Sequence, residues 1–309
     1  MIGILDIAGF TAGEADLVKS IAKLGYNDTP LFSSIKKGMP SKAADTGLGH
    51  NWNYETSAGG DGDLAFVEGS VPADLRSPDI GSSLNHYQIV KDTYGVTGSM
   101  ENMNRTDGTN ELANAGADSA INHRKKIEKI LFGTQTPVKG VKATATAGIA
   151  GGLQNWMTVN NTVDAKVAAV DQALSMKYLR EMLKINYLNG QQITHLFMGD
   201  IQKDALDDIL TAKNMVNTLG AKVLEGTNYL TLTNMAYAQN VRIILSPFVA
   251  ANEIIAVNHA SLSLVFKRLT KSYEIARSTD EVKKEIISEL TLRVNNPYGV
   301  SKLTNLAIA

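Results

Sequence analysis

Apolar residues recur at helical spacing over residues 109–132, which gives the clearest element prediction in the chain. The apolar stripe comprises Leu112, Ala113, Ala117, Ala120, Ile121, Ile127, Ile130 and Leu131. Thr109 can cap the start, Glu111 lies in the first turn, and basic residues lie near the end, as the helix macrodipole favours. Gly133 suits the stop. The pattern predicts a helix about 35 Å long, enough to serve as a spine.

The first 58 residues have the pattern of an arm rather than of a domain. Residues 14–24 place apolar side chains on one stripe, which predicts a short amphipathic helix. In "NDTPLFSSIKKG", Leu31, Phe32 and Ile35 form a compact apolar cluster after a turn. Residues 38–62 are rich in Gly, Ser, Asn and Asp, with few anchors (Leu48, Trp52 and Tyr54). Because so long a structureless stretch is uncommon inside a compact domain, we expect it to lie on another surface.

Two extended runs follow, and they predict a long β-hairpin. "LAFVEGSV" (64–71) and "LNHYQIVKDTYGVTGSM" (84–100) contain β-formers in imperfect alternation, and a polar tip with prolines (72–83) separates them. An isolated hairpin is marginally stable in water. We therefore expect the apolar side chains of the hairpin to be buried against another part of the protein or another molecule.

The remainder alternates between helical and strand patterns. A second helix is predicted over 164–189, and a third over 200–214 with Asp200 as its cap. Strands are predicted from the short apolar runs between 192 and 270, and "ELTLRVNNP" (289–297) alternates strictly. Near the end, two strand-like runs flank a charged bend. The fold class expected is α+β.

Composition narrows the class of protein. The chain has 309 residues, 44% of them hydrophobic, and a formal net charge of −1. A near-balanced charge argues against a dedicated nucleic-acid binder, which needs a basic surface. The absence of cysteine excludes disulfides, cysteine-ligated metals and thiol nucleophiles. No apolar run approaches the ~20 residues that span a bilayer, and "MIGILDIAGF" lacks the basic leader of a signal peptide, so we expect neither a membrane nor a removed leading segment.

The sequence contains none of the common catalytic motifs that we looked for. There is no nucleophile elbow, zinc-protease motif or phosphate-binding loop. The histidines, at 50, 86, 123, 195 and 259, show no metal-ligand spacing, and His86 and His123 are expected at the surface or in an interface. The acidic helix 200–208 is best explained as a solvated face. The basic run "HRKKIEK" (123–129) fits contact with phosphate and a solvated helix end equally well. No catalytic residue, cofactor or metal site is predicted.

The order of the parts resembles a tailed-bacteriophage major capsid protein of the Hong Kong 97 fold, and more narrowly the subfamily typified by the SU-ten phage protein. The matching stretches are "NDTPLFSSIKKG", "VEGS", "NHYQIVKDTYGVTGSM", "NHRKKIEKILFG" and "ELTLRVNNPYGVSKL". The resemblance covers nearly the whole chain. It implies an N-terminal arm (1–58), an extended hairpin or E-loop (59–103), a peripheral domain (104–159 and 263–309) with the spine helix 109–132, and an axial domain (160–262).

The resemblance also implies the role. Such proteins are not enzymes: they form pentamers and hexamers of an icosahedral shell around double-stranded DNA, in a virion assembled in the bacterial cytoplasm. Partners would be further copies of the chain, separate scaffold, portal and decoration proteins, and DNA held weakly without sequence specificity. Some relatives crosslink through a hairpin lysine. The tip 72–83 here has Arg76 and no lysine, so that chemistry is not expected.

These considerations give a hypothesis for the assembly interface. Leu31, Phe32 and Ile35 pack on the spine-helix side of the subunit or of a neighbour, and Trp52 and Tyr54 anchor the continuing arm. The hairpin lies over an adjacent copy, where Arg76 makes an intersubunit ion pair.

Other readings remain open. An encapsulin-type compartment shares the fold, and a tail-tube protein is a related structural class. A less favoured alternative is a hydrolase that uses the helix 200–208 and His195.

Overall fold

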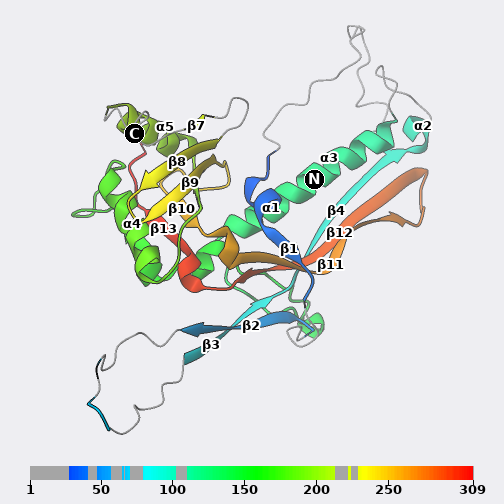
Figure 1. Cartoon of the computed structure of the whole chain (residues 1–309). Helices are drawn as coiled ribbons and strands as arrows, with labels where there is room; N and C mark the ends of the chain where they lie inside the picture. The colour runs from blue at the N-terminus through cyan, green and yellow to red at the C-terminus, as the bar shows by residue number, and fades with distance from the viewer. Residues whose placement is uncertain are drawn as a thin grey trace.

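The computed structural model describes residues 28–40, 47–56, 65, 67–69, 79–101, 110–212, 222–223 and 229–308. Within them lie two sheets with helices and one separate two-stranded ribbon (Figure 1). The helix predicted over 14–24, the tip 72–78 and Arg76 lie outside the described residues.

The first sheet has the strand order β1-β11-β12-β4. Its members are β1 (Lys36–Gly38), β11 (Leu262–Ile275), β12 (Glu281–Val294) and β4 (Gln88–Thr97). The strands β11 and β12 form the two runs around the charged bend that the sequence predicts. Helix α3 (Glu111–Phe132) lies along β4 and β12, and the short helix α2 (Gly98–Glu101) follows β4 (Figure 1).

Helix α3 confirms the predicted spine, but its cap and its buried face differ from the prediction. The side chain of Asn110, not Thr109, accepts the N–H groups of Leu112 and Ala113. The fully buried positions are Glu111, Ser119, His123, Ile127, Glu128, Leu131 and Phe132, while Ala113, Ala117 and Ala120 of the predicted stripe are exposed. The apolar stripe did not predict the buried side of α3 correctly, because polar side chains, such as His123 and Glu128, occupy part of that side.

The second sheet has the order β5-β13-β10-β6-β9-β8-β7. Its strands are β5 (Thr162–Asp164), β13 (Val300–Thr304), β10 (Ile254–Val257), β6 (His195–Met198), β9 (Ala238–Leu245), β8 (Tyr229–Met235) and β7 (Lys222–Val223). Alternate residues of β6 and β10 enter different cores. Leu196 and Ile254 pack with helices α4 (Met176–Leu188) and α5 (Asp200–Ala212). Phe197 and Ile255 pack with the end of α3.

The predicted start of the second helix needs correction. The predicted helix 164–189 begins only at Met176, because Ala168 and Ala169 adopt positive φ in a turn closed by paired Val167 and Val170. Strand β13, from the range predicted for the peripheral domain, pairs with β10 and β5 in the second sheet, and the domain bounds stay a prediction.

The ribbon consists of β2 (Gly49–Thr56) paired antiparallel with β3 (Asp79–His86). The sequence pattern instead predicts a hairpin of 64–71 with 84–100. Part of 84–100 is β4, which pairs with β12, and most of 64–71 lies outside the described residues. Strand 49–56 was missed because glycine and asparagine dilute its β-propensity, although His50, Trp52 and Tyr54 alternate at the spacing of a strand.

Short elements complete the described chain. Helix α1 (Pro30–Ser34) precedes β1, and the 3₁₀ turns are η2 (Lys142–Thr144), η3 (Leu153–Trp156), η4 (Val159–Asn161), η5 (His259–Ser261) and η6 (Pro297–Gly299).

Candidate assembly site

The N-terminal end of α1 is capped by a side chain from the spine helix. Thr29 makes no side-chain cap, and Pro30 at the first position has no N–H to satisfy. The next two N–H groups, those of Leu31 and Phe32, donate to the two carboxylate oxygens of Glu128 at 2.9 and 2.6 Å. A single carboxylate therefore satisfies two of the unpaired donors at this helix end, where the helix dipole favours negative charge.

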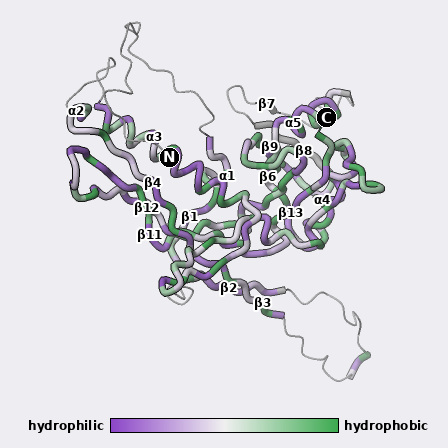
Figure 2. Tube along the Cα trace, turned by 180° about the vertical axis from the view of Figure 1, so that it is seen from behind, coloured by the Kyte–Doolittle hydropathy of each residue, from purple (hydrophilic) through white to green (hydrophobic). Residues whose placement is uncertain are grey.

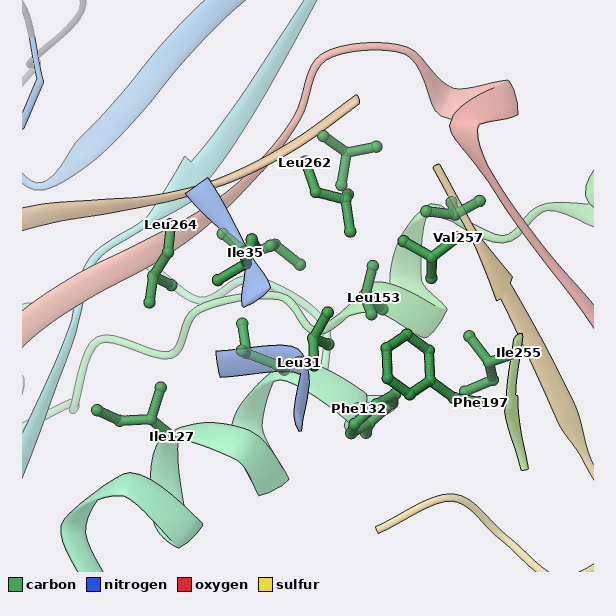
Figure 3. Packing of buried hydrophobic residues seen from close by; sticks show 14 of the residues in the cluster. Leu31, Ile35, Ile127, Phe132, Leu153, Phe197, Ile255, Val257, Leu262 and Leu264 are labelled. Carbon is green, nitrogen blue, oxygen red and sulfur yellow. The ribbon is translucent and has the colours of Figure 1, made fainter. Parts of the chain in front are cut away.

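The apolar cluster of the arm packs into the chain's own core (Figure 3). Leu31 and Ile35 are 0% and 3% exposed, and their neighbours include Ile127 of α3 and Leu264 of β11. Phe32 is half-buried, with the Lys37 ammonium 4.2 Å from its ring centroid. Of the two docking sites that the sequence left open, the structure shows the spine-helix side of the same subunit. A role for these side chains between copies stays a prediction.

Strand β1 extends the same docking. It pairs parallel with β11, from Lys36 opposite Ser263 to Gly38 opposite Val265. Thus residues 29–38 contact both the spine helix and the sheet, through apolar burial, two hydrogen bonds to the Glu128 carboxyl and a short strand pairing.

Burial makes the Glu128 carboxyl unusually weak as an acid. Desolvation raises its pKa from 4.5 to about 7, although the N–H groups of Phe32 and Leu31 and the charge of Lys37 oppose the rise. Between pH 4.5 and 7 the folded chain therefore binds a proton at Glu128 that the unfolded chain does not bind.

We expect this carboxyl to make stability fall as pH rises. Its contribution is fully present below about pH 4.5 and is lost as pH passes about 7, with a total on the order of 3 kcal/mol. Replacing Glu128 with glutamine should remove this slope. The measurement is the free energy of unfolding of both variants at intervals from pH 4 to 8; parallel curves for the two would contradict the assignment.

His123 is buried rather than at the surface as expected. Its Nδ1 lies 3.0 Å from an Asp92 oxygen, and its Nε2 lies 2.6 Å from Ser288 Oγ. Burial lowers the pKa of His123, while Asp92 opposes the shift. Lys126 donates to the second Asp92 oxygen. The basic run 123–129 is therefore only partly a solvated face: two of its members, His123 and Glu128, tie α3 to β4, β12 and the arm.

His195 and His259 form a pair that sequence spacing did not reveal. Their Nδ1 atoms are 2.5 Å apart, and Ser34 Oγ of α1 lies 2.7 Å from His259 Nε2. Burial, His259 and Arg242 lower the pKa of His195 to about 3. Burial and Arg242 lower that of His259 to about 4. Both rings are neutral at pH 7, and they connect the arm with the second sheet.

The base of the β2–β3 ribbon is fixed to its own chain by buried polar bonds. The indole Nε1 of Trp52 donates to the Val294 carbonyl at 2.8 Å, and the ring packs on Trp156 at 5.3 Å between centroids. Asn85 donates to the Leu292 carbonyl at 2.7 Å and accepts the Gly151 N–H at 2.8 Å. The predicted role of Trp52 between copies is not tested by these contacts and stays a prediction.

The outer part of the ribbon has no such support. Neither strand pairs with a third one within the described chain, and the ribbon projects from the body (Figure 1). Ile80 is 70% exposed and Tyr54 is half-buried. An isolated hairpin is marginal in water, so this surface is suited to contact with another molecule.

Other candidate chemistry does not assemble into a site. Asp204 and Asp208 of α5 are exposed, and Asp207 pairs with Lys203, so the acidic helix is a solvated face as predicted. His195 pairs with His259 and not with this helix. In the described residues no three metal-ligating side chains gather. None of the helices described there is long and apolar enough to cross a bilayer.

These features define the class of protein: a spine helix crossed by an arm, a projecting ribbon and a helix-covered mixed sheet form a Hong Kong 97-like capsid fold. The Cyanophage A-1(L) capsid matches with a TM-score of 0.67 and 15% identity over 98% of this chain and 99% of that one. An encapsulin, SrpI of Synechococcus elongatus, gives 0.63 and 12% over 100% and 98%. Microbacterium phage Oxtober96 gives 0.60 and 13% over 96% of both.

The family model of the SU10 major capsid protein matches residues 6–307, and the chain belongs to this family. It is a phage major capsid protein, a structural component of the virion rather than an enzyme, and the hydrolase alternative is set aside. A comparison with curated protein sequences gave no match.

Proposed function

We propose that this chain forms the pentamers and hexamers of an icosahedral shell that encloses the double-stranded DNA of a tailed bacteriophage. Assembly takes place in the host bacterial cytoplasm, with scaffold, portal and decoration functions supplied by separate proteins. The arm (1–58) and the ribbon with its loop provide overlap between neighbouring copies, and Phe32, Tyr54 and Arg76 are proposed interface residues.

The observation that carries the proposal is the unsupported ribbon. Within the described residues, Trp52 and Asn85 hold the base of the ribbon to the body, and the ribbon presents Ile80 and Leu84 to solvent. A second copy that covers these side chains would supply the burial that the hairpin lacks alone. Each contact is modest, but a closed shell links many of them, and linked contacts gain through effective concentration.

The charge balance supports weak contact with the genome. A net charge of −1 gives no general attraction to phosphate, whose neutralisation dominates affinity for DNA. A shell wall that does not grip the duplex leaves it free to enter during packaging.

Electron microscopy of the expressed chain tests the proposal. We expect closed, round particles, alone or with a co-expressed scaffold protein, and capsomers of five or six copies when the particles are dissociated. Rods would indicate a tail-tube protein. Shells that carry an enzyme cargo encoded beside the chain would favour the encapsulin reading, while a monomer under all conditions would refute a shell.

A further inference from the structure

A chain of polar contacts joins the C-terminal end of α1 to the second sheet. Ser34 Oγ lies 2.7 Å from His259 Nε2, and His259 Nδ1 lies 2.5 Å from His195 Nδ1. Thr194 Oγ1 lies 2.8 Å from the same His195 nitrogen. Because β1 begins two residues after Ser34, these contacts also help to fix where the arm joins the first sheet, beside α3 and β11 (Figures 1 and 2).

The hydrogens of this chain of contacts can all be placed when both imidazole rings are neutral. The Ser34 hydroxyl donates to the Pro30 carbonyl at 2.6 Å, so its oxygen accepts from His259 Nε2. His259 Nδ1 then carries a lone pair and accepts from His195 Nδ1. The assignment, which follows from the network of partners, uses one hydrogen for each ring, as neutral imidazole has.

An additional proton on the histidine pair, His195 and His259, has no favourable place. On His259 Nδ1 it would face the N–H of His195 across 2.5 Å. On His195 Nε2 it would add a positive charge near Arg242, which lies opposite His195 in the pairing of β6 with β9. Arg242 is the cation that acts on both rings, and together with burial it lowers the pKa of His259 to about 4.

We propose that the histidine pair is an acid-sensitive latch on the arm. When the pair gains a proton, His259 moves toward water and away from Ser34. The C-terminal end of α1 and strand β1 then separate from the sheets, while the N-terminal end of α1 stays bound. The latch lies within one subunit and does not depend on whether copies form a shell.

The N-terminal end of α1 responds to pH with the opposite sign. Glu128 caps this end, and burial raises the pKa of its carboxyl to about 7. The cation that faces Glu128 is Lys37 of β1, which Arg124 of α3 approaches in turn. A falling pH therefore tightens the docking at Glu128 and loosens the docking at His259. General acid denaturation would loosen both ends together.

The linkage between protonation and docking sets the size of the effect. We take the pKa of His259 as its ordinary 6.5 when the ring is released and as about 4 when α1 is docked. Because docking lowers this pKa, the contribution of His259 is full above pH 6.5 and is lost as the pH falls toward 4. The population of released β1 should then rise about twentyfold between pH 7 and pH 5.

Hydrogen exchange of the dissociated subunit at pH 7 and pH 5, corrected for the intrinsic amide rates, measures this release. We expect the protection of residues 36–38 to fall about twentyfold at pH 5, while that of Leu31 and Phe32 is kept or rises. His259→Gln should abolish the pH dependence at residues 36–38. The matched control is His86→Gln, on β3 of the ribbon, which should retain it.

The His259 ring gives a second readout that needs no substitution at the latch. Its titration in the wild type, followed by NMR, should give a pKa well below 6.5. Equal protection of residues 36–38 at the two pH values, or a parallel loss of protection at both ends of α1, would overturn the latch. A His259 ring that titrates near pH 6.5 would overturn it as well, even if His259→Gln failed to fold.

Discussion

Replacing Leu31 with alanine is expected to lower the free energy of unfolding by about 2–5 kcal/mol, the range for a buried leucine that leaves a cavity. Leu31 is 0% exposed and packs between the spine helix and the sheet, where α1 has little freedom to collapse because Glu128 holds its N-terminal end. Denaturant unfolding of the dissociated subunit measures the effect.

The matched control is Met39→Ala, one residue beyond β1, because Met39 is 65% exposed. Its effect should stay within about 0.5 kcal/mol. Equal, small effects at Leu31 and Met39 would show that the arm does not dock on its own subunit in solution.

The docking of residues 29–38 changes how an arm truncation should be designed. Deleting residues 1–38 would remove α1 and β1, expose Ile127 and Leu264, and leave the Glu128 carboxyl without its two donors. If this variant failed to assemble, the cause could be destabilisation of the subunit as well as loss of the arm's contacts with other copies. A truncation that ends at residue 27 preserves these contacts and isolates the contribution of the preceding segment.

The sequence predicted best those elements whose pattern is decided locally. The spine helix was found because its residues favour helix throughout, and β10 and β12 were found because their apolar residues fit strands. The start of α4 was placed too early because a positive φ at Ala168 and Ala169 leaves no signature in two alanines. Strand β2 was missed because its pairing depends on β3, thirty residues away and across the loop.

The polar contacts of the candidate site could not be predicted in the same way. Glu128 stands among basic residues, and only the approach of α1 turns it into a buried cap. His195 and His259 meet because β6 pairs with β10 in the register that puts His195 opposite Val257. Such contacts depend on tertiary register, which one sequence does not specify. The order of segments, in contrast, was enough to indicate the family.

The second large effect is expected at the base of the ribbon. Trp52→Ala removes a buried ring that packs on Trp156 and an indole N–H that donates to the Val294 carbonyl. Large-to-small changes of this kind cost about 3–5 kcal/mol. We expect the ribbon to detach, which limited proteolysis within residues 49–56 and 79–86 would detect, together with a loss of shells.

Ile80→Ser separates folding from assembly on the same ribbon. Ile80 is 70% exposed, so the change should alter the stability of the dissociated subunit by no more than about 0.5 kcal/mol. In shells, however, the proposed contact with the neighbouring copy would bury the serine hydroxyl in place of an apolar side chain. We therefore expect fewer closed particles by electron microscopy. If Ile80→Ser assembled like the wild type while Trp52→Ala did not, the ribbon would matter through its anchored base alone, and its outer face would not be an interface.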